Sequence, residues 1–323
     1  MKKIIFINFI FLILLILLIE IIFRVIFSYN VQGISKNLIV SKAGYSFNTP
    51  NLNSAKAFGV KIYTDRNGFR IKKNHSYKIN KNDILVIGGS VTFGPAIKAE
   101  DTFVEKLNFT SDLNVRNASV FGTTFENNIK TLKYFESKDK VKKIFISFPL
   151  DDILSENIDL SELNKKNDNN KNLNNILKNN KFLFFINTFI RSKSATYVFI
   201  KGIISNPQED NYAYDIKLYE NKELLKQLEK NLTKLNNLID RNKIIFFSIP
   251  YAAQVKKSRC LKKDISENIL RKIFEKNKFK IVFLHDEMCK RNQPINFYLK
   301  NDPVHLNTEG HNFVFKYLKK YLN

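Results

Sequence analysis

The hydrophobic positions of this chain form one long run near its start and several short runs further along. The long run covers residues 4–27, where Glu20 and Arg24 lie four apart and can pair on one helix face. As a helix, this run would span about 36 Å, which is enough to cross a bilayer. Because Lys2 and Lys3 precede it, the positive-inside rule keeps the N-terminus in the cytoplasm and exports the rest.

Two interpretations of the N-terminal segment, residues 1–27, follow from its flanks. A cleaved signal peptide ends in a small-x-small site, whereas this run continues with Phe27-Ser28-Tyr29-Asn30. We therefore predict one uncleaved transmembrane helix, and a cleaved signal is the alternative.

Five short apolar runs beyond residue 82 are typical of buried parallel strands. The runs are Ile84–Ile87, Asn114–Ala118, Ile144–Phe148, Ile244–Ile249 and Ile281–Leu284. Helical patterns are found at Thr102–Leu107, Phe125–Phe135, Lys217–Asp240 and Phe313–Leu322. Strands that alternate with helices predict a doubly wound parallel sheet with right-handed crossovers.

Two segments stand outside this alternation. Residues 28–82 are a polar lead-in, in which Asn67-Gly68 predicts a tight turn. Residues 155–215 form an insertion in the main domain, residues 83–323, and its Asn- and Lys-rich first part favours a loop. Two apolar stretches of the insertion predict a cap over the sheet edge, namely Phe182–Ile190 and Tyr197–Ile204.

The formal net charge of +23 and the pI of 9.7 raise the question of nucleic acid. The lysines are dispersed among asparagine and isoleucine, and no basic cluster alternates with aromatic residues as base stacking would require. We therefore expect no nucleic-acid partner. An exported basic surface attracts anionic lipid or acidic polysaccharide instead.

The chain has two cysteines, Cys260 and Cys289, whose spacing matches no metal motif. In an oxidising compartment they can form one disulfide. Two free buried thiols are an equally weighted alternative. Four histidines without paired spacing predict no metal site, and we expect no cofactor.

Candidate chemistry lies where the predicted strands end. The first strand breaks at Gly88-Gly89-Ser90, which can present a hydroxyl at the carboxyl edge where open α/β sheets bind ligands. Asn117–Gly122 and Pro149–Ile153 end the next two strands at the same edge. Asp302 and His305 precede the last helix. A serine becomes nucleophilic when a histidine takes its proton and an acid orients that histidine.

These blocks resemble those of the SGNH hydrolases, also called the GDSL family, from about Asp65 to the C-terminus. The matching motifs are Asn67-Gly68-Phe69-Arg70, Gly88-Gly89-Ser90-x-Thr92-x-Gly94, Asn117 to Gly122, and Asp302-x-x-His305 followed by Leu306-Asn307 and Gly310-His311. The resemblance implies a flavodoxin-like three-layer α/β sandwich with a central parallel sheet of about five strands.

The resemblance also implies roles for individual residues. Ser90 would be the nucleophile, His305 the general base and Asp302 the acid that orients it. The backbone N–H groups of Ser90 and Gly122 would form two parts of the oxyanion hole, where one donor is commonly worth about 3 kcal/mol.

The third oxyanion-hole donor of the family is an asparagine, which aligns with Asp151 here. An ionised carboxylate cannot donate a hydrogen bond. Three explanations stay open: Asp151 is protonated in an apolar pocket, the hole works with two donors, or a nearby asparagine such as Asn157 serves.

Together with the anchor, the resemblance implies a single-pass protein of the bacterial cytoplasmic (inner) membrane with its catalytic domain outside the cytoplasm. It would be a serine esterase or acyl transferase for ester-linked acyl groups, first of all acetyl groups, on envelope polysaccharide or on small esters. A membrane protein would supply the acyl group for transfer. The alternative, which Asp151 motivates, is an inactive SGNH-like binding or assembly protein for an envelope polysaccharide.

Overall fold

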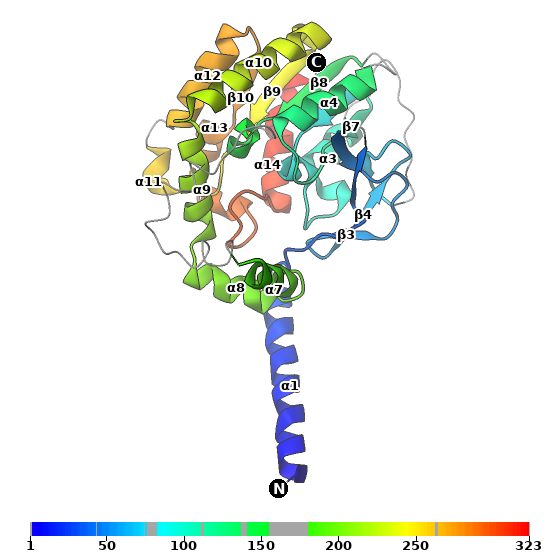
Figure 1. Ribbon diagram of the computed structural model, residues 1–323, viewed down its shortest axis with the longest axis vertical. Coiled ribbons are helices and arrows are strands. Elements are labelled where there is room, and N and C mark those ends of the chain that lie inside the picture. The colour runs from blue at the N-terminus through cyan, green and yellow to red at the C-terminus, as the bar shows by residue number, and fades with distance from the viewer. Residues whose placement is uncertain are drawn as a thin grey trace.

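The computed structural model describes residues 2–42, 44–73, 75, 83–110, 113–136, 141–154, 180–261 and 264–322. Figure 1 shows an α/β domain carried on one long helix, α1 (Lys2–Val25), which projects away from it. This helix is apolar, is exposed along its length and is long enough to span a membrane. It fits a single membrane anchor and a signal sequence alike. Asn157 and the first part of the insertion lie outside the described residues.

The central sheet contains the five predicted parallel strands, and their bounds closely match the apolar runs. Across the sheet they are β10 (Lys280–Phe283), β9 (Ile244–Ser248), β8 (Lys143–Ser147), β6 (Ile84–Ile87) and β7 (Val115–Asn117). Numbered along the chain, this order is 2-1-3-4-5 when read from β7, which is the flavodoxin-like order. The predicted α/β fold class is therefore confirmed.

The sheet is nevertheless mixed, because the lead-in extends it beyond β7 to eight strands. The added antiparallel strands are β5 (Arg70–Ile71), β4 (Val60–Thr64) and β3 (Ala55–Ala57). A separate hairpin joins β1 (Ile39–Lys42) to β2 (Tyr45–Asn48). These strands are short and half-buried, so no apolar run marks them: in β3, Ala55 and Ala57 are buried while Lys56 is exposed.

Helices cover both faces of the sheet and complete a three-layer sandwich. On β6, Leu85 and Ile87 belong to one hydrophobic core and Ile84 and Val86 to the other, because successive side chains of a strand point to opposite faces. One core packs α4 (Phe125–Glu136), α10 (Lys222–Leu238) and α12 (Ile265–Lys276). The other packs α3 (Phe103–Phe109), α13 (His285–Cys289) and α14 (Thr308–Leu318).

The remaining helices are short or lie at the domain's edge. They are α2 (Ser90–Phe93), α7 (Lys181–Arg191), α8 (Ala195–Ile204), α9 (Pro207–Leu218) and α11 (Lys257–Cys260). Short 3-10 helices are found at Ala99–Asp101, Leu150–Ile153, Arg241–Lys243, Pro294–Phe297 and Lys319–Tyr321. The single helix predicted for Lys217–Asp240 begins later, because the Asn221 side chain accepts from the N–H groups of Glu223 and Leu224 and starts α10 there.

The two apolar stretches of the insertion form α7 and α8, which lie across the domain end of α1 (Figure 1). α8 also packs against the loop before α14. A Cβ atom on Gly202 would lie 1.9 Å from Nδ2 of Asn301, so only glycine allows this approach. The predicted cap therefore lies beside the loop that carries Asp302.

Candidate active site

The turn that presents Ser90 depends on close backbone packing at the end of β6. A Cβ atom on Gly88 would lie 2.7 Å from Cβ of Ser147 on β8, which is too near for any side chain. α2 begins at Ser90 and is capped at its C-terminal end by Gly94, whose φ of 73° is readily adopted by glycine. The strand thus leads directly into a single helical turn with Ser90 at its start.

Arg70 of the lead-in motif holds the far end of this turn. Its buried guanidinium donates hydrogen bonds to the carbonyl oxygens of Phe93 and Gly94, and to that of Ile97 at 2.5 Å. Burial lowers the pKa of Arg70 to about 9, against the opposing effect of nearby glutamates, so the group remains charged at neutral pH. Two residues earlier, Gly68 adopts a φ of 78° in the predicted turn.

His305 and Asp302 lie on the loop between the 3-10 helix at Pro294–Phe297 and α14. Nδ1 of His305 lies 2.9 Å from both carboxylate oxygens of Asp302. Nε2 of His305 lies 2.9 Å from Oγ of Ser90. The structure therefore brings together all three residues predicted from the two ends of the domain, in the order that a serine nucleophile requires.

The Asp302 carboxyl is held in its charged form. Burial alone would raise its pKa, but His305 and the backbone N–H groups of Val304 and His305 outweigh burial and lower the pKa below its usual range. These two N–H groups donate to Oδ1 at 3.0 and 2.8 Å. A charged Asp302 is suited to orient the ring and to stabilise an imidazolium.

Sequence reasoning missed several residues that surround this triad. Phe121 stacks on the His305 ring at 5.9 Å between centroids, and Phe58 approaches the same ring edge-on at 5.1 Å. Nε2 of Gln32 donates to Oδ2 of Asp302 at 3.4 Å. Phe58 and Gln32 belong to the lead-in, where no motif or periodicity marks them.

The loop after β7 supplies Gly122, the second predicted oxyanion-hole residue. The N–H of Val120 donates to the carbonyl oxygen of Gly88 at 2.9 Å, which ties this loop to the nucleophile turn. Gly122 has a φ of 72° and open space where a Cβ atom would be. The loop therefore lies beside Ser90, with Phe121 of the same loop on His305.

Asp151, at the third predicted position, is part of a cluster of acidic groups around Tyr251. The Tyr251 hydroxyl donates to Asp215 at 2.7 Å and also interacts with Asp151. Although Asp151 reaches solvent, the protein packed around its carboxyl raises its pKa, and its interactions with Tyr251 and with the charge of His305 oppose this rise. The interaction with His305 places Asp151 at the same site.

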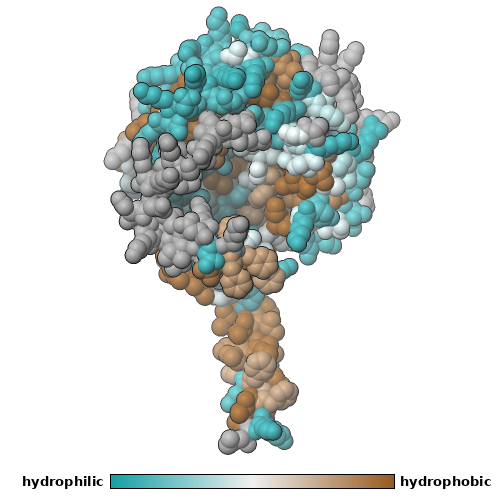
Figure 2. Space-filling model, in the orientation of Figure 1, coloured by the Kyte–Doolittle hydropathy of each residue, from teal (hydrophilic) through white to brown (hydrophobic). Residues whose placement is uncertain are grey.

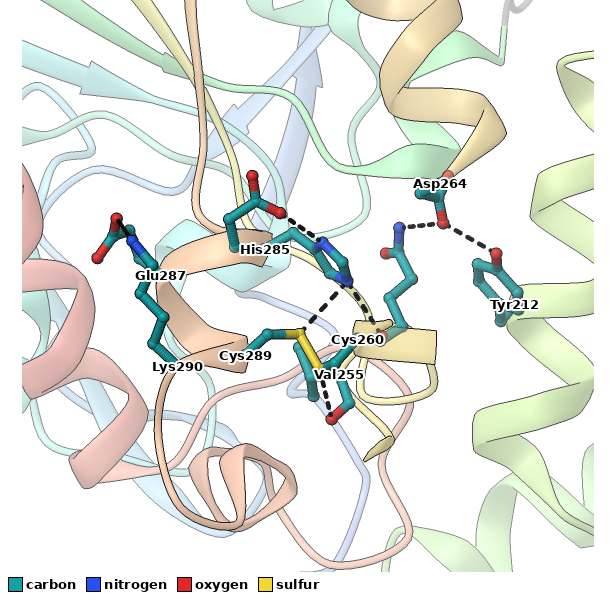
Figure 3. Close-up of polar contacts among 10 residues, drawn as sticks. Tyr212, Val255, Cys260, Asp264, His285, Glu287, Cys289 and Lys290 are labelled. Atoms are coloured by element: carbon teal, nitrogen blue, oxygen red, sulfur yellow. Dashed lines mark hydrogen bonds and ion pairs between the residues drawn. A yellow bond between two sulfur atoms is a disulfide. The ribbon is translucent and has the colours of Figure 1, made fainter. Parts of the chain in front are cut away.

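Cys260 and Cys289 form a disulfide with a Cα–Cα distance of 5.5 Å (Figure 3). The structure therefore has the disulfide instead of two free thiols. His285 is the first residue of α13 and lies against the bridge, with Nε2 3.5 Å from Sγ of Cys289. The two sulfurs and the histidine are potential metal ligands within 4.8 Å of one another, but both sulfurs are used by the disulfide.

His311 is a packing residue in the first turn of α14. It is fully buried and stacks on Phe103 at 5.5 Å, and its Nδ1 accepts the Phe103 N–H. Burial and nearby cations lower its pKa to about 3. His311 therefore stays neutral at physiological pH.

Comparison with known proteins gives matches among solved structures alone. No family model matches the sequence, and no curated protein matches it. A member of the lipolytic protein G-D-S-L family from Veillonella parvula is 13% identical, with 74% of this chain and 96% of that chain covered and a TM-score of 0.42. A lipase/acylhydrolase from Enterococcus faecalis is 14% identical, with 75% and 97% covered and a TM-score of 0.41.

A third similar structure is a catalytic mutant of an acetylxylan esterase from Geobacillus stearothermophilus. It is 14% identical, with 76% of this chain and 97% of that chain covered and a TM-score of 0.40. The chain is thus similar in structure to lipolytic hydrolases of the G-D-S-L type. At these identities the likeness concerns the fold, and the function has to be argued from the site itself.

Proposed function

We propose that this chain is an exported, membrane-anchored serine esterase or acyl transferase of the SGNH type. The observation that carries the proposal is the relay from Asp302 through His305 to Ser90, with 2.9 Å at each step. A histidine held in this way can take the proton of the Ser90 hydroxyl. This base makes Ser90 nucleophilic, which a serine without such a partner is not.

Ser90 Oγ attacks the ester carbonyl while Nε2 of His305 takes the hydroxyl proton. The bond to the leaving alcohol then breaks, and His305 returns the proton to that alcohol. Water resolves the resulting acyl-enzyme in hydrolysis, and a sugar hydroxyl resolves it in transfer. The backbone N–H groups of Ser90 and Gly122 stabilise the oxyanion that forms in between.

Contacts at the end of α1 support an anchor that is retained. The Glu20 carboxylate accepts hydrogen bonds from the N–H groups of Ala195 at 2.7 Å and Thr196 at 3.1 Å, and from the Ser194 hydroxyl at 2.8 Å. Ala195 and Thr196 lie in the first turn of α8, where backbone N–H groups have no partner within the helix. An acidic side chain stabilises such groups. Cleavage after α1 would remove that partner.

The substrates that suit this placement are acyl esters, first of all acetyl esters, of a cell-envelope polysaccharide. The net charge of +23 favours an acidic polymer on the exported side of the membrane. In transfer, a membrane protein in the same bilayer would deliver the acyl group.

Labelling with a serine-directed phosphonate tests the proposal on the full chain in detergent. Label is expected on Ser90 and is expected to be lost in Ser90→Ala and His305→Ala. Ser41→Ala, which removes an exposed serine from β1, serves as the matched control and should label normally. Cleavage of a chromogenic acetyl ester should follow the same pattern. Undiminished cleavage by Ser90→Ala would sink the proposed chemistry.

A second candidate function rests on Asp151. A carboxylate at the oxyanion position repels the developing negative charge, which favours a protein that binds an envelope polysaccharide without turnover. A folded wild-type chain that neither labels nor cleaves esters would favour this alternative.

A further inference from the structure

Helices α7 and α8 expose an unusual number of large apolar side chains. Seven such residues are between 46% and 68% exposed, and together we call them the α7–α8 face. They are Phe182, Phe184, Phe185, Phe189, Ile200, Ile203 and Ile204. Soluble proteins seldom expose contiguous apolar surface of this kind unless something covers it.

The spacing shows that both helices are amphipathic. On α7, Phe182, Phe185 and Phe189 follow one another at helical intervals, and the last two rings stack at 6.4 Å. Asn187 of α7 and Val198 of α8 are buried on the domain side. The apolar residues therefore face outward while the other side packs on the protein.

This face continues the apolar surface of α1. Figure 2 shows the brown surface of α1 extending onto the adjoining end of the domain. Phe23 of α1 contacts Phe199 of α8 at 4.4 Å between ring centroids. Arg24 donates to the carbonyl oxygen of Lys193, between α7 and α8, at 2.6 Å. α7 and α8 therefore lie at the level of the last turns of α1.

The length of α1 places that level at the membrane surface. The part before Glu20, residues 4–19, is apolar except for Asn8 and spans about 24 Å as a helix. The hydrocarbon core of a bilayer is about 30 Å thick. The last turns of α1 therefore complete the crossing, and α7 and α8, which lie beside these turns, are at the outer edge of the hydrocarbon core.

We propose that the α7–α8 face docks into the outer interface of the same bilayer that α1 crosses. This inference rests on the proposed anchor. Lipid is the occupant because the face is continuous with a helix that is itself embedded in lipid. Lys193 is exposed at the same level and suits anionic headgroups, whereas Arg24 is paired with Glu20 at 2.6 Å.

Docking would also fix the position of the candidate active site above the membrane. Asn301, next to Asp302, packs on Gly202 of α8, and its Nδ2 donates to the Tyr29 hydroxyl at 3.4 Å. Gln32, shortly after α1, reaches the Asp302 carboxylate. The loop that carries Asp302 is thus held against the docked helices. This arrangement suits ester substrates that are presented at the membrane surface.

Site-specific fluorescence in vesicles tests the proposal with the full chain. Single substitutions Phe185→Cys, Ile203→Cys, Ile13→Cys and Leu261→Cys are labelled with a polarity-sensitive dye. The native cysteines are joined in the disulfide and do not compete for the label. Leu261 is the control, because it is a large apolar residue that is 85% exposed away from α1. The proteins are reconstituted in phosphatidylcholine–phosphatidylglycerol vesicles, with or without bromine on the acyl chains.

Brominated lipid is expected to reduce the fluorescence at residues 185, 203 and 13 but not at residue 261. Loss at residue 13 alone would overturn the docking proposal and leave the anchor intact. Absence of loss at residue 13 would overturn the anchor, and with it this inference.

Discussion

Replacing Asp151 with asparagine is expected to raise the rate of ester cleavage, and to raise it more as the pH increases. A phenol has a single proton, and Tyr251 donates its proton to Asp215 at 2.7 Å. Asp151 must therefore supply a proton of its own to hydrogen bond with Tyr251, which leaves none for the oxyanion. An asparagine amide has two N–H bonds and can serve both partners.

The size of the gain follows from the worth of one oxyanion-hole donor. Such a donor contributes about 10²- to 10³-fold in kcat, so this is the largest gain that Asp151→Asn can give. The protein packed around its carboxyl raises the pKa of Asp151. Below that raised pKa the wild-type carboxyl is neutral and only the missing donor separates the two proteins. Above it, the wild type also carries a negative charge beside the oxyanion, so the ratio grows with pH.

Steady-state hydrolysis of a chromogenic acetyl ester between about pH 5 and pH 9 measures this ratio. Asp151→Ala is the matched variant, because it removes the charge without adding a donor, and its gain should be smaller than that of Asp151→Asn. A ratio at or below one across the whole pH range would refute the reasoning. Asp151 would then lie outside the oxyanion hole, and the hole would rest on its two backbone donors.

Three further predictions follow from the same geometry. Asp302→Asn is expected to lower kcat by about 10³- to 10⁴-fold, because an amide does not fix the tautomer of His305; unchanged kcat would exclude the relay. Asp152→Asn is expected to raise the free energy of unfolding at pH 7 by about 1 kcal/mol. Burial raises the pKa of the Asp152 carboxyl in the folded state. As the pH rises, the carboxyl ionises more readily in the unfolded chain, which lowers the free energy of unfolding of the wild type but not that of Asp152→Asn. In urea unfolding the gain should vanish below about pH 4, and a gain that persists there would contradict this cause. Reduction of Cys260–Cys289 is expected to lower the free energy of unfolding by about 3 to 4 kcal/mol, and replacing both cysteines with serine should abolish the response to reductant.

The sequence predicts the parallel strands well because a strand buried on both faces is an uninterrupted apolar run. The same reasoning misses the antiparallel edge. In β3 and β4 only alternate residues are buried, and the two strands are three and five residues long, so the local signal is weak. Their place depends on pairing with β5 and β7, which local composition does not encode.

The three residues of the relay were also predictable, because each lies at a strand end or turn with recognisable chemistry. The residues that support them were not. A sequence motif includes Arg70, but its role depends on the fold, which brings its guanidinium to the carbonyl oxygens that follow Ser90. Phe58 and Gln32 act on His305 and Asp302 from more than 240 residues away along the chain, and the fold alone creates those contacts.

Asp151 shows why the identity of a residue does not determine its charge. Alignment with the SGNH motif marks it as a carboxylate where an amide is expected, which suggests an impaired site. The protein packed around that carboxyl raises its pKa and so favours the protonated form, although the interaction with Tyr251 and the charge of His305 oppose the rise. A protonated carboxyl neither repels an oxyanion nor, with its proton given to Tyr251, assists it. The site would then be slower than one with asparagine but still able to turn over, which is why the asparagine variant should be faster.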